Sequence, residues 1–71
     1  MRNSKLKSRL STVKTSDLHP GDAVINEGEI QFIIEIILLD DGYVNITYIW
    51  RGRIARETHV GTFVVERIIV Q

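Results

Sequence analysis

The sequence predicts an all-β fold, a small barrel of five strands in meander order, preceded by a basic arm. Isoleucine, valine and aromatic residues gather in short runs, which is typical of strands because these side chains pack well on a pleated surface. Each run ends at a glycine or a short polar segment, which indicates tight turns. The chain has 71 residues, of which 44% are hydrophobic, and this suits one small globular domain.

Residues 1–14 form the predicted arm, which contains five basic residues and no acidic residue. Residues 15–71, the predicted barrel domain, contain nine acidic residues and four arginines, so the arm carries +5 and the domain −5. Leu6, Leu10 and Val13 follow helical spacing, whereas the serine, threonine and asparagine residues around them disfavour a helix. We therefore expect either a flexible tail or a short helix that forms against the domain or a partner.

A turn is expected before the first strand, because Pro20-Gly21 supplies the two backbone conformations that a tight turn needs. A short strand is expected at 23–27 and a long one at 29–39, which contains five isoleucines and a phenylalanine. One face of the long strand is expected to carry alternate apolar residues: Ile30, Phe32, Ile34, Ile36 and Leu38. The other face is polar at first and apolar later, which indicates a strand that bends.

Three further strands are expected at 43–50, 54–60 and 63–70. Turns that contain glycine separate them, and Asp41-Gly42 is a favoured hairpin pair. We expect each glycine to serve its turn through a positive φ. Alternation places four residues of the first of these strands on one face: Val44, Ile46, Tyr48 and Trp50.

Five strands joined by short turns in so small a chain predict a strongly bent sheet that closes on itself. The junction at 51–53 is too short for the helix that an OB fold carries there, so an SH3-like barrel is favoured. The segment Asp17-Leu18-His19-Pro20-Gly21-Asp22, followed by Ala23-Val24-Ile25, resembles the opening of SH3-like and KOW-type barrels. The resemblance implies this fold for residues 17–71 and transfers no functional residue. The compact design with a basic arm is also similar to small phage-encoded proteins.

The sequence carries no pattern of an enzyme active site, so we expect no catalytic residue, no metal and no cofactor. Cysteine is absent, which excludes disulfides and thiolate metal sites. His19 and His59 lack the spacing of metal ligands, and a turn explains Asp40 and Asp41. No serine lies in a nucleophile elbow, and no glycine-rich loop resembles a phosphate cradle.

Aromatic and basic residues around the hairpin at 43–56 form the candidate partner-binding surface: Tyr43, Trp50, Arg51, Arg53 and Arg56. Stacking rings beside cations occur in nucleic-acid-binding barrels, and the same residue types dominate protein interfaces. Because Trp50 shares a face with Ile46, two interpretations stay open for Trp50, which are core packing and partner contact.

The apolar end of the long strand is a candidate oligomer contact. Ile37 and Leu39 would be exposed in so small a fold, and an exposed apolar strand must be protected. A second copy of the chain, a larger protein, or the apolar stripe of the arm could cover them.

We expect a non-enzymatic binding module that docks on a larger protein partner, as an adaptor or inhibitor does. The alternative is a nucleic-acid-binding barrel that uses the Arg51–Arg56 turn region, and the net charge of −5 on the domain argues against it. In that alternative the cations of the arm would contact the nucleic acid: Arg2, Lys5, Lys7, Arg9 and Lys14. No apolar run is long enough for a secretory signal or a membrane span, so we expect a cytoplasmic protein without membrane contact.

Overall fold

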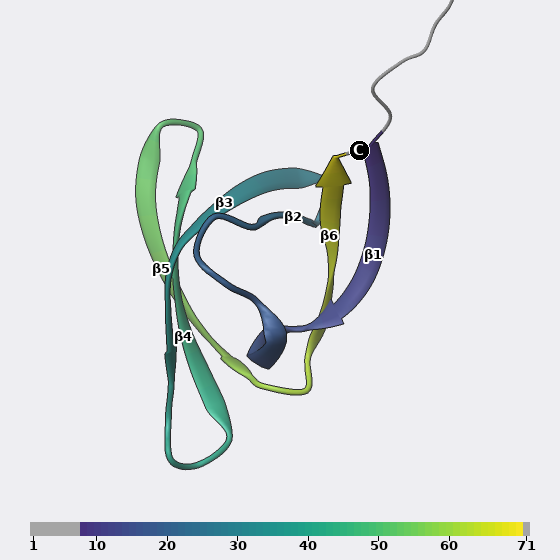
Figure 1. Cartoon of the computed structure of the whole chain (residues 1–71). Helices are drawn as coiled ribbons and strands as arrows, with labels where there is room; N and C mark the ends of the chain where they lie inside the picture. Colours follow the sequence, from purple (N-terminus) through teal and green to yellow (C-terminus); the bar gives the residue numbers. More distant parts are fainter. Residues whose placement is uncertain (1–7, 71) are drawn as a thin grey trace, which may run out of the picture.

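The computed structural model describes residues 8–70, and its strands form one antiparallel sheet (Figure 1). The all-β prediction is confirmed, and the bounds of the five expected strands agree with the structure to within one residue. Among the described residues, the one helical element is a single 3₁₀ turn. In chain order the elements are β1 (Ser8–Lys14), η1 (Thr15–Asp17), β2 (Ala23–Asn26), β3 (Glu29–Leu38), β4 (Tyr43–Trp50), β5 (Arg53–Val60) and β6 (Val64–Val70).

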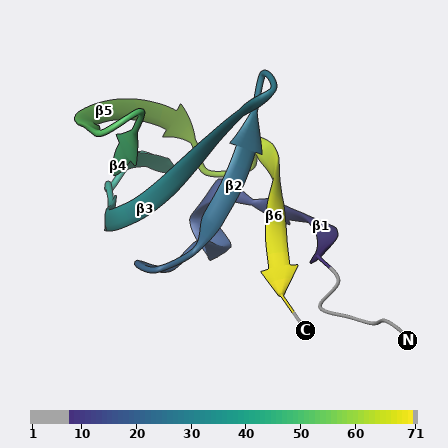
Figure 2. The same ribbon diagram turned by 90° about the horizontal axis from the view of Figure 1, so that it is seen from above.

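The sheet contains six strands and is open. Its order is β1-β6-β2-β3-β4-β5, so β1 and β5 are its edges. Figures 1 and 2 show that the sheet curls around one side, which we call the inner face, and its convex side is the outer face. The predicted closure into a barrel of five strands is not confirmed.

β1 corrects the prediction for the arm. Residues 8–14 are neither a flexible tail nor a helix, because they pair with β6 from Ser8 opposite Val70 to Lys14 opposite Val64. A strand with so many polar side chains is held mainly by backbone hydrogen bonds, which any residue except proline can supply. Residues 1–7 of the arm lie outside the described residues.

β6 lies between β1 and β2, although it follows β5 in the chain. The turn after β5 carries the chain away from that edge of the sheet toward the opposite edge, where β6 pairs with β1 and with β2 (Figure 1). β2 is paired on its other side with β3. The first and last described residues of the chain therefore lie on adjacent strands.

A β-bulge in β3 changes the face that each side chain occupies. The register of β3 against β4 skips one residue at Ile34. Before the bulge, Phe32 is 53% exposed, whereas Ile36, after the bulge, packs against the core. The prediction that alternate residues from 30 to 38 share one face is therefore wrong. Figure 1 shows the bend that the sequence predicts in this strand.

The core lies on the inner face and is centred on β4, where three of the four residues predicted to share a face are buried and Trp50 is partly buried. Thr47, on the other face of β4, is buried as well. A core of this size limits the stability that the chain can reach alone. Its buried apolar members are Leu18, Val24, Ile33, Val44, Ile46 and Tyr48. The partly buried residues packed against them are Val13, Ile36, Trp50, Ala55 and Val65.

Three distant segments meet at the turn between β5 and β6. Thr15 is fully buried, and its Oγ1 donates a 3.0 Å hydrogen bond to the carbonyl of Val60. The amide of Gly61 donates a 2.8 Å hydrogen bond to the carbonyl of Gly42. A Cβ on Gly61 would lie 3.1 Å from that oxygen and 3.3 Å from Cβ of Ser16. Gly61 therefore serves a close approach of backbones, which corrects the expectation of a positive φ at this turn.

Candidate binding site

An open pocket of about 230 Å³ lies on the inner face, where the turn between β2 and β3 meets β4 and β5. Its wall combines two aromatic rings with three carboxylates and two amides. The residues that line it are Asn26, Glu27, Glu29, Gln31, Tyr48, Trp50 and Glu57.

Two hairpin turns shape the mouth of this pocket. Glu27 and Gly28 join β2 to β3 with φ of 53° and 80°, and Arg51 and Gly52 join β4 to β5 with φ of 52° and 75°. Positive φ at both central residues defines the type I′ turn, whose twist matches that of paired strands. The glycine in each pair makes this turn accessible, so the sequence itself positions Glu27 and Arg51.

Trp50 forms one side of the pocket and also packs against the core, so core packing applies in part and partner contact stays a prediction. Its Nε1 donates a 2.8 Å hydrogen bond to Oε1 of Glu29. Arg51 donates from Nη2 to Oε2 of the same carboxylate at 2.8 Å, and its guanidinium lies 5.1 Å from the centre of the Trp50 ring. One carboxylate thus holds an indole and a cation side by side.

Tyr48 and Glu57 form the floor of the pocket. The hydroxyl of Tyr48 donates a 2.6 Å hydrogen bond to Oε2 of Glu57, and Nε2 of His59 lies 2.8 Å from Oε1 of that carboxylate. Burial, followed by the hydrogen bond to Glu57, raises the pKa of Tyr48 to about 12. The same hydrogen bond is the largest cause that lowers the pKa of Glu57.

The electrostatics of the pocket favour a positively charged group. Hydrogen bonds from Trp50 and then Arg51 lower the pKa of Glu29, so the Glu29 and Glu57 carboxylates are both ionised at neutral pH. Arg51 offsets one negative charge, and Glu27 adds another carboxylate to the wall. Ionised carboxylates beside aromatic faces attract ammonium and guanidinium groups and repel phosphate.

The three predicted arginines do not form one cluster. Arg51 lies at the pocket, and Arg53 is exposed at the start of β5. Arg56 lies on the outer face, where its Nε donates a 3.2 Å hydrogen bond to Oγ1 of Thr47. Tyr43 is also on the outer face and is 44% exposed, far along β4 from Trp50.

The remaining candidates lie away from the pocket. Arg9 and Lys14 are exposed on β1, whereas Arg2, Lys5 and Lys7 lie outside the described residues. Leu10 is exposed on β1 and leaves the apolar end of β3 uncovered. In the sheet the two candidate oligomer contacts are exposed, as the sequence predicts: Ile37 and Leu39.

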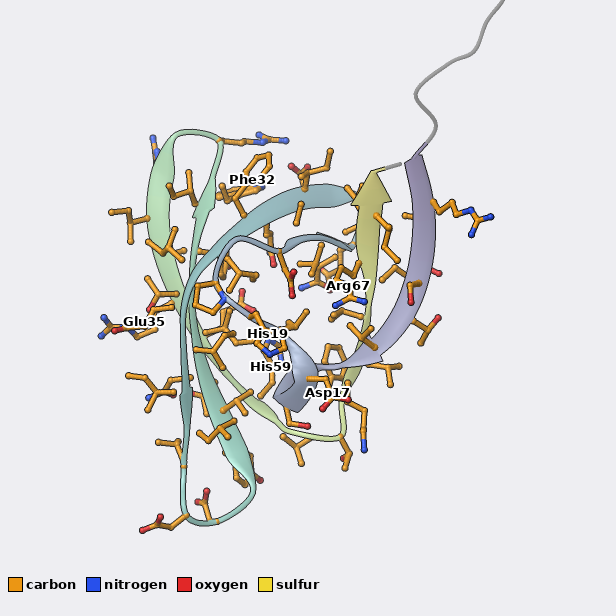
Figure 3. The ribbon with its side chains drawn as sticks, viewed as in Figure 1. Asp17, His19, Phe32, Glu35, His59 and Arg67 are labelled. Atoms are coloured by element: carbon orange, nitrogen blue, oxygen red, sulfur yellow. The ribbon has the colours of Figure 1, made fainter. Side chains whose placement is uncertain are left out.

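The two histidines have structural contacts. The ring of His59 stacks on Phe63 with 4.9 Å between centroids, and the amide of His19 donates a 2.8 Å hydrogen bond to Oδ2 of Asp22. Figure 3 shows both histidines, together with Arg67, toward the inner side of the sheet. Within residues 8–70, no three histidine or acidic side chains are grouped closely enough to hold a metal ion. The same residues include no helix with the length and hydropathy needed to cross a bilayer.

Sequence reasoning missed the acidic side of the pocket. Alternation correctly places Tyr48 and Trp50 on one face, but Glu29 and Glu57 reach them from neighbouring strands. The Glu27-Gly28 pair indicates the turn that sets Glu29 beside Asn26, but no local signal places Glu29 beside Trp50, because that contact depends on the register of β3 against β4.

The comparisons with known proteins found no match. No protein-family model, curated protein or solved structure resembles this chain closely enough to be assigned to it.

Proposed function

We propose that this chain is a non-enzymatic binding module that docks on a larger protein, and that its pocket receives a basic side chain of that partner. The observation that carries the proposal is the wall of the pocket, in which Tyr48 and Trp50 stand beside three carboxylates. Aromatic rings are frequent anchors at protein interfaces, and ionised carboxylates give such a site its selectivity for cations.

Arg51 illustrates the chemistry that the pocket accepts. Its guanidinium bonds to Glu29 through two nitrogens and lies over the Trp50 ring. The carboxylates of Glu27 and Glu57 stand in the same wall, so an arginine or lysine from a partner would meet the same combination of ring and charge.

The nucleic-acid alternative has weaker support. It would draw on the cations of residues 1–14, two of which are exposed on β1: Arg9 and Lys14. The carboxylates beside Trp50 would repel a phosphate backbone, and Arg56 lies on the opposite face from Arg51.

The SH3-like resemblance remains part of the proposal. β2 to β6 are five strands in the neighbour order β6-β2-β3-β4-β5, and β1 adds a sixth strand beside β6. This order is compatible with an SH3-like module that has gained an edge strand. The cytoplasmic location and the likeness to small phage-encoded proteins stay predictions.

Trp50 supplies the test, because it is the one tryptophan in the chain. Its fluorescence is recorded while capped peptides that contain arginine or lysine are added, and peptides with glutamine at those positions serve as ligand controls. We expect a saturable change for the basic peptides alone. Glu27→Gln should weaken binding by about fivefold to tenfold, since it removes one charge-assisted hydrogen bond. Glu66→Gln, which changes an exposed carboxylate on β6, is the matched control.

Fluorescent single- and double-stranded oligonucleotides form the second arm of the experiment. Oligonucleotide binding that falls steeply with salt, together with no response to basic peptides, would replace the proposal with the alternative. A flat Trp50 signal with every peptide, at low salt and high concentration, would also sink the proposal.

A further inference from the structure

The outer face of β3, β4 and β5 is apolar at both ends and carries a single pair of charges. Glu35 on β3 and Arg56 on β5 are the charged residues whose side chains the register places on this part of the sheet. Figure 3 shows Glu35 on the convex side, away from Arg67 and the histidines. The face is therefore distinct from the pocket, which opens on the inner side.

The register arranges this face in rows that run across the three strands. One end carries the apolar row Phe32–Ile49–Ile54, and the next outward-facing row is Glu35–Thr47–Arg56. The rows that follow toward the other end are Ile37–Asn45–Thr58 and Leu39–Tyr43–Val60.

The apolar ends of the face are open to solvent. Ile54 is 72% exposed and Phe32 is 53% exposed at one end, while Tyr43 and Val60 are each 44% exposed at the other. Large apolar side chains gathered on one sheet face mark an interaction surface more often than side chains scattered singly.

Glu35 and Arg56 are placed symmetrically about Thr47. Thr47 donates a 3.4 Å hydrogen bond to Glu35, and Arg56 donates a 3.2 Å hydrogen bond to Thr47. Both charged groups hydrogen-bond to the same hydroxyl, and within residues 8–70 they form no direct ion pair with each other. Each charge is thus available to a partner of opposite sign.

A second copy, related by a two-fold axis along β4, satisfies both charges at once. Such an axis exchanges β3 and β5 between copies, so each Glu35 meets the other copy's Arg56. The same operation puts Phe32 against Ile54 and Leu39 against Val60, so the apolar rows also meet. Aligned packing of two twisted sheets keeps the strands within about 30° of parallel, which preserves these row contacts.

The charges select this axis over the perpendicular one. A two-fold axis that runs across the strands at Thr47 would set Glu35 against Glu35 and Arg56 against Arg56. Two like-charge contacts at an interface are unfavourable and reject that arrangement.

We propose that the outer face of β3, β4 and β5 binds a second copy of this chain face to face, with its two-fold axis along β4. The eight-residue strands β4 and β5 give a face about 26 Å long and about 14 Å wide, at ordinary strand dimensions. An interface of this size is small for a specific complex, so the dimer is expected to dissociate on dilution.

Light scattering coupled to size exclusion, over a dilution series of the full chain, measures the mass of the parent and of three charge variants. We expect a parent dimer at high concentration, and a dissociation constant raised at least about tenfold in Glu35→Arg and in Arg56→Glu. The double variant that carries both changes restores opposite charges across the axis and should dimerise like the parent. Arg53→Glu, a reversal at an exposed position off this face, is the matched control.

Circular dichroism checks that each variant is folded. If a charge variant fails to fold, Ile54→Ser replaces it, since a side chain that is 72% exposed contributes little to the core and its loss should still abolish the dimer. A parent that stays monomeric at every concentration overturns the proposal. A dimer that tolerates both single reversals, or a double variant that stays monomeric, overturns it as well, because the contact then lies elsewhere.

Discussion

Tyr48 and Glu57 lie diagonally across β4 and β5, and the phenol of Tyr48 donates a 2.6 Å hydrogen bond to the carboxylate of Glu57. Tyr48 is 5% exposed, so this carboxylate replaces the water that its hydroxyl loses on folding. The pair joins the hydrophobic core to the charged wall of the pocket. It also makes the stability of the fold depend on pH at both ends of the scale.

In alkali, we expect Tyr48 to ionise near pH 12 and the fold to lose stability between pH 10 and 12. Tyr48 ionises near pH 10.0 in the unfolded chain and near pH 12 in the folded chain. Its stabilisation of the fold is therefore complete below pH 10 and is lost as the pH rises through this window. Tyrosinate absorbance in Tyr43→Phe, where Tyr48 is the sole tyrosine, measures the titration. Ionisation of folded Tyr48 at its ordinary value would contradict the prediction, and Tyr48→Phe should lack the alkaline effect.

In acid, the stability of the Glu57→Gln variant should approach that of the parent. The pKa of Glu57 is lowered below its ordinary 4.5 by the hydrogen bond from Tyr48, so its stabilisation is present above that value and is lost as the pH falls through the folded pKa. Urea midpoints of the two proteins should therefore differ most at neutral pH and converge in acid. A constant difference across the series would contradict this account. Glu66→Gln, which removes an exposed carboxylate from β6, is the matched control.

Thr15→Val should destabilise the fold by about 1 kcal/mol, because it keeps the shape of a buried side chain and removes its hydrogen bond. The carbonyl of Val60 retains the amide of Phe63 as a donor, so the cost should stay near that value. Chemical denaturation measures it. Thr12→Val, at an exposed position of β1, should change the free energy of unfolding by much less; equal effects would show that the hydroxyl of Thr15 is unimportant.

Gly61→Ala should destabilise the fold by about 1–3 kcal/mol, as overpacking in a close contact does. The added Cβ would press on the Gly42 carbonyl and on Ser16, and the first of these belongs to the backbone. Thermal unfolding measures the change. An unaltered midpoint would mean that the turn between β5 and β6 shifts freely, and the account of Gly61 would then be wrong.

Much of the strand pattern follows from the sequence because it depends on local properties. Glycine at Gly28, Gly42 and Gly52 punctuates the chain, and β-branched runs lie between these turns. Alternation along β4 correctly places its apolar core residues on one face, because successive side chains of a strand point to opposite faces. It does not predict that Thr47, on the other face, is buried as well.

The remaining features depend on long-range pairing, which no local pattern encodes. β1 is a strand because β6 lies beside it, and its serine, threonine and lysine residues give no apolar signal. The bulge at Ile34 carries no glycine to mark it, yet it reverses the faces of the residues that follow. The pocket is equally hidden, since Glu29 and Glu57 meet Trp50 and Tyr48 only through the register of three strands.

The position of β6 between β1 and β2 also has a kinetic consequence. β3, β4 and β5 are consecutive hairpin partners, so their contacts close short loops and can form early. β1 meets β6 only when residues fifty or more positions apart come together, as Ser11 does with Arg67. We expect docking of β6 to limit the folding rate, and until it docks both β1 and β2 lack a backbone partner on that side. Chaperone binding and aggregation would then compete for the same two strands before the sheet is complete.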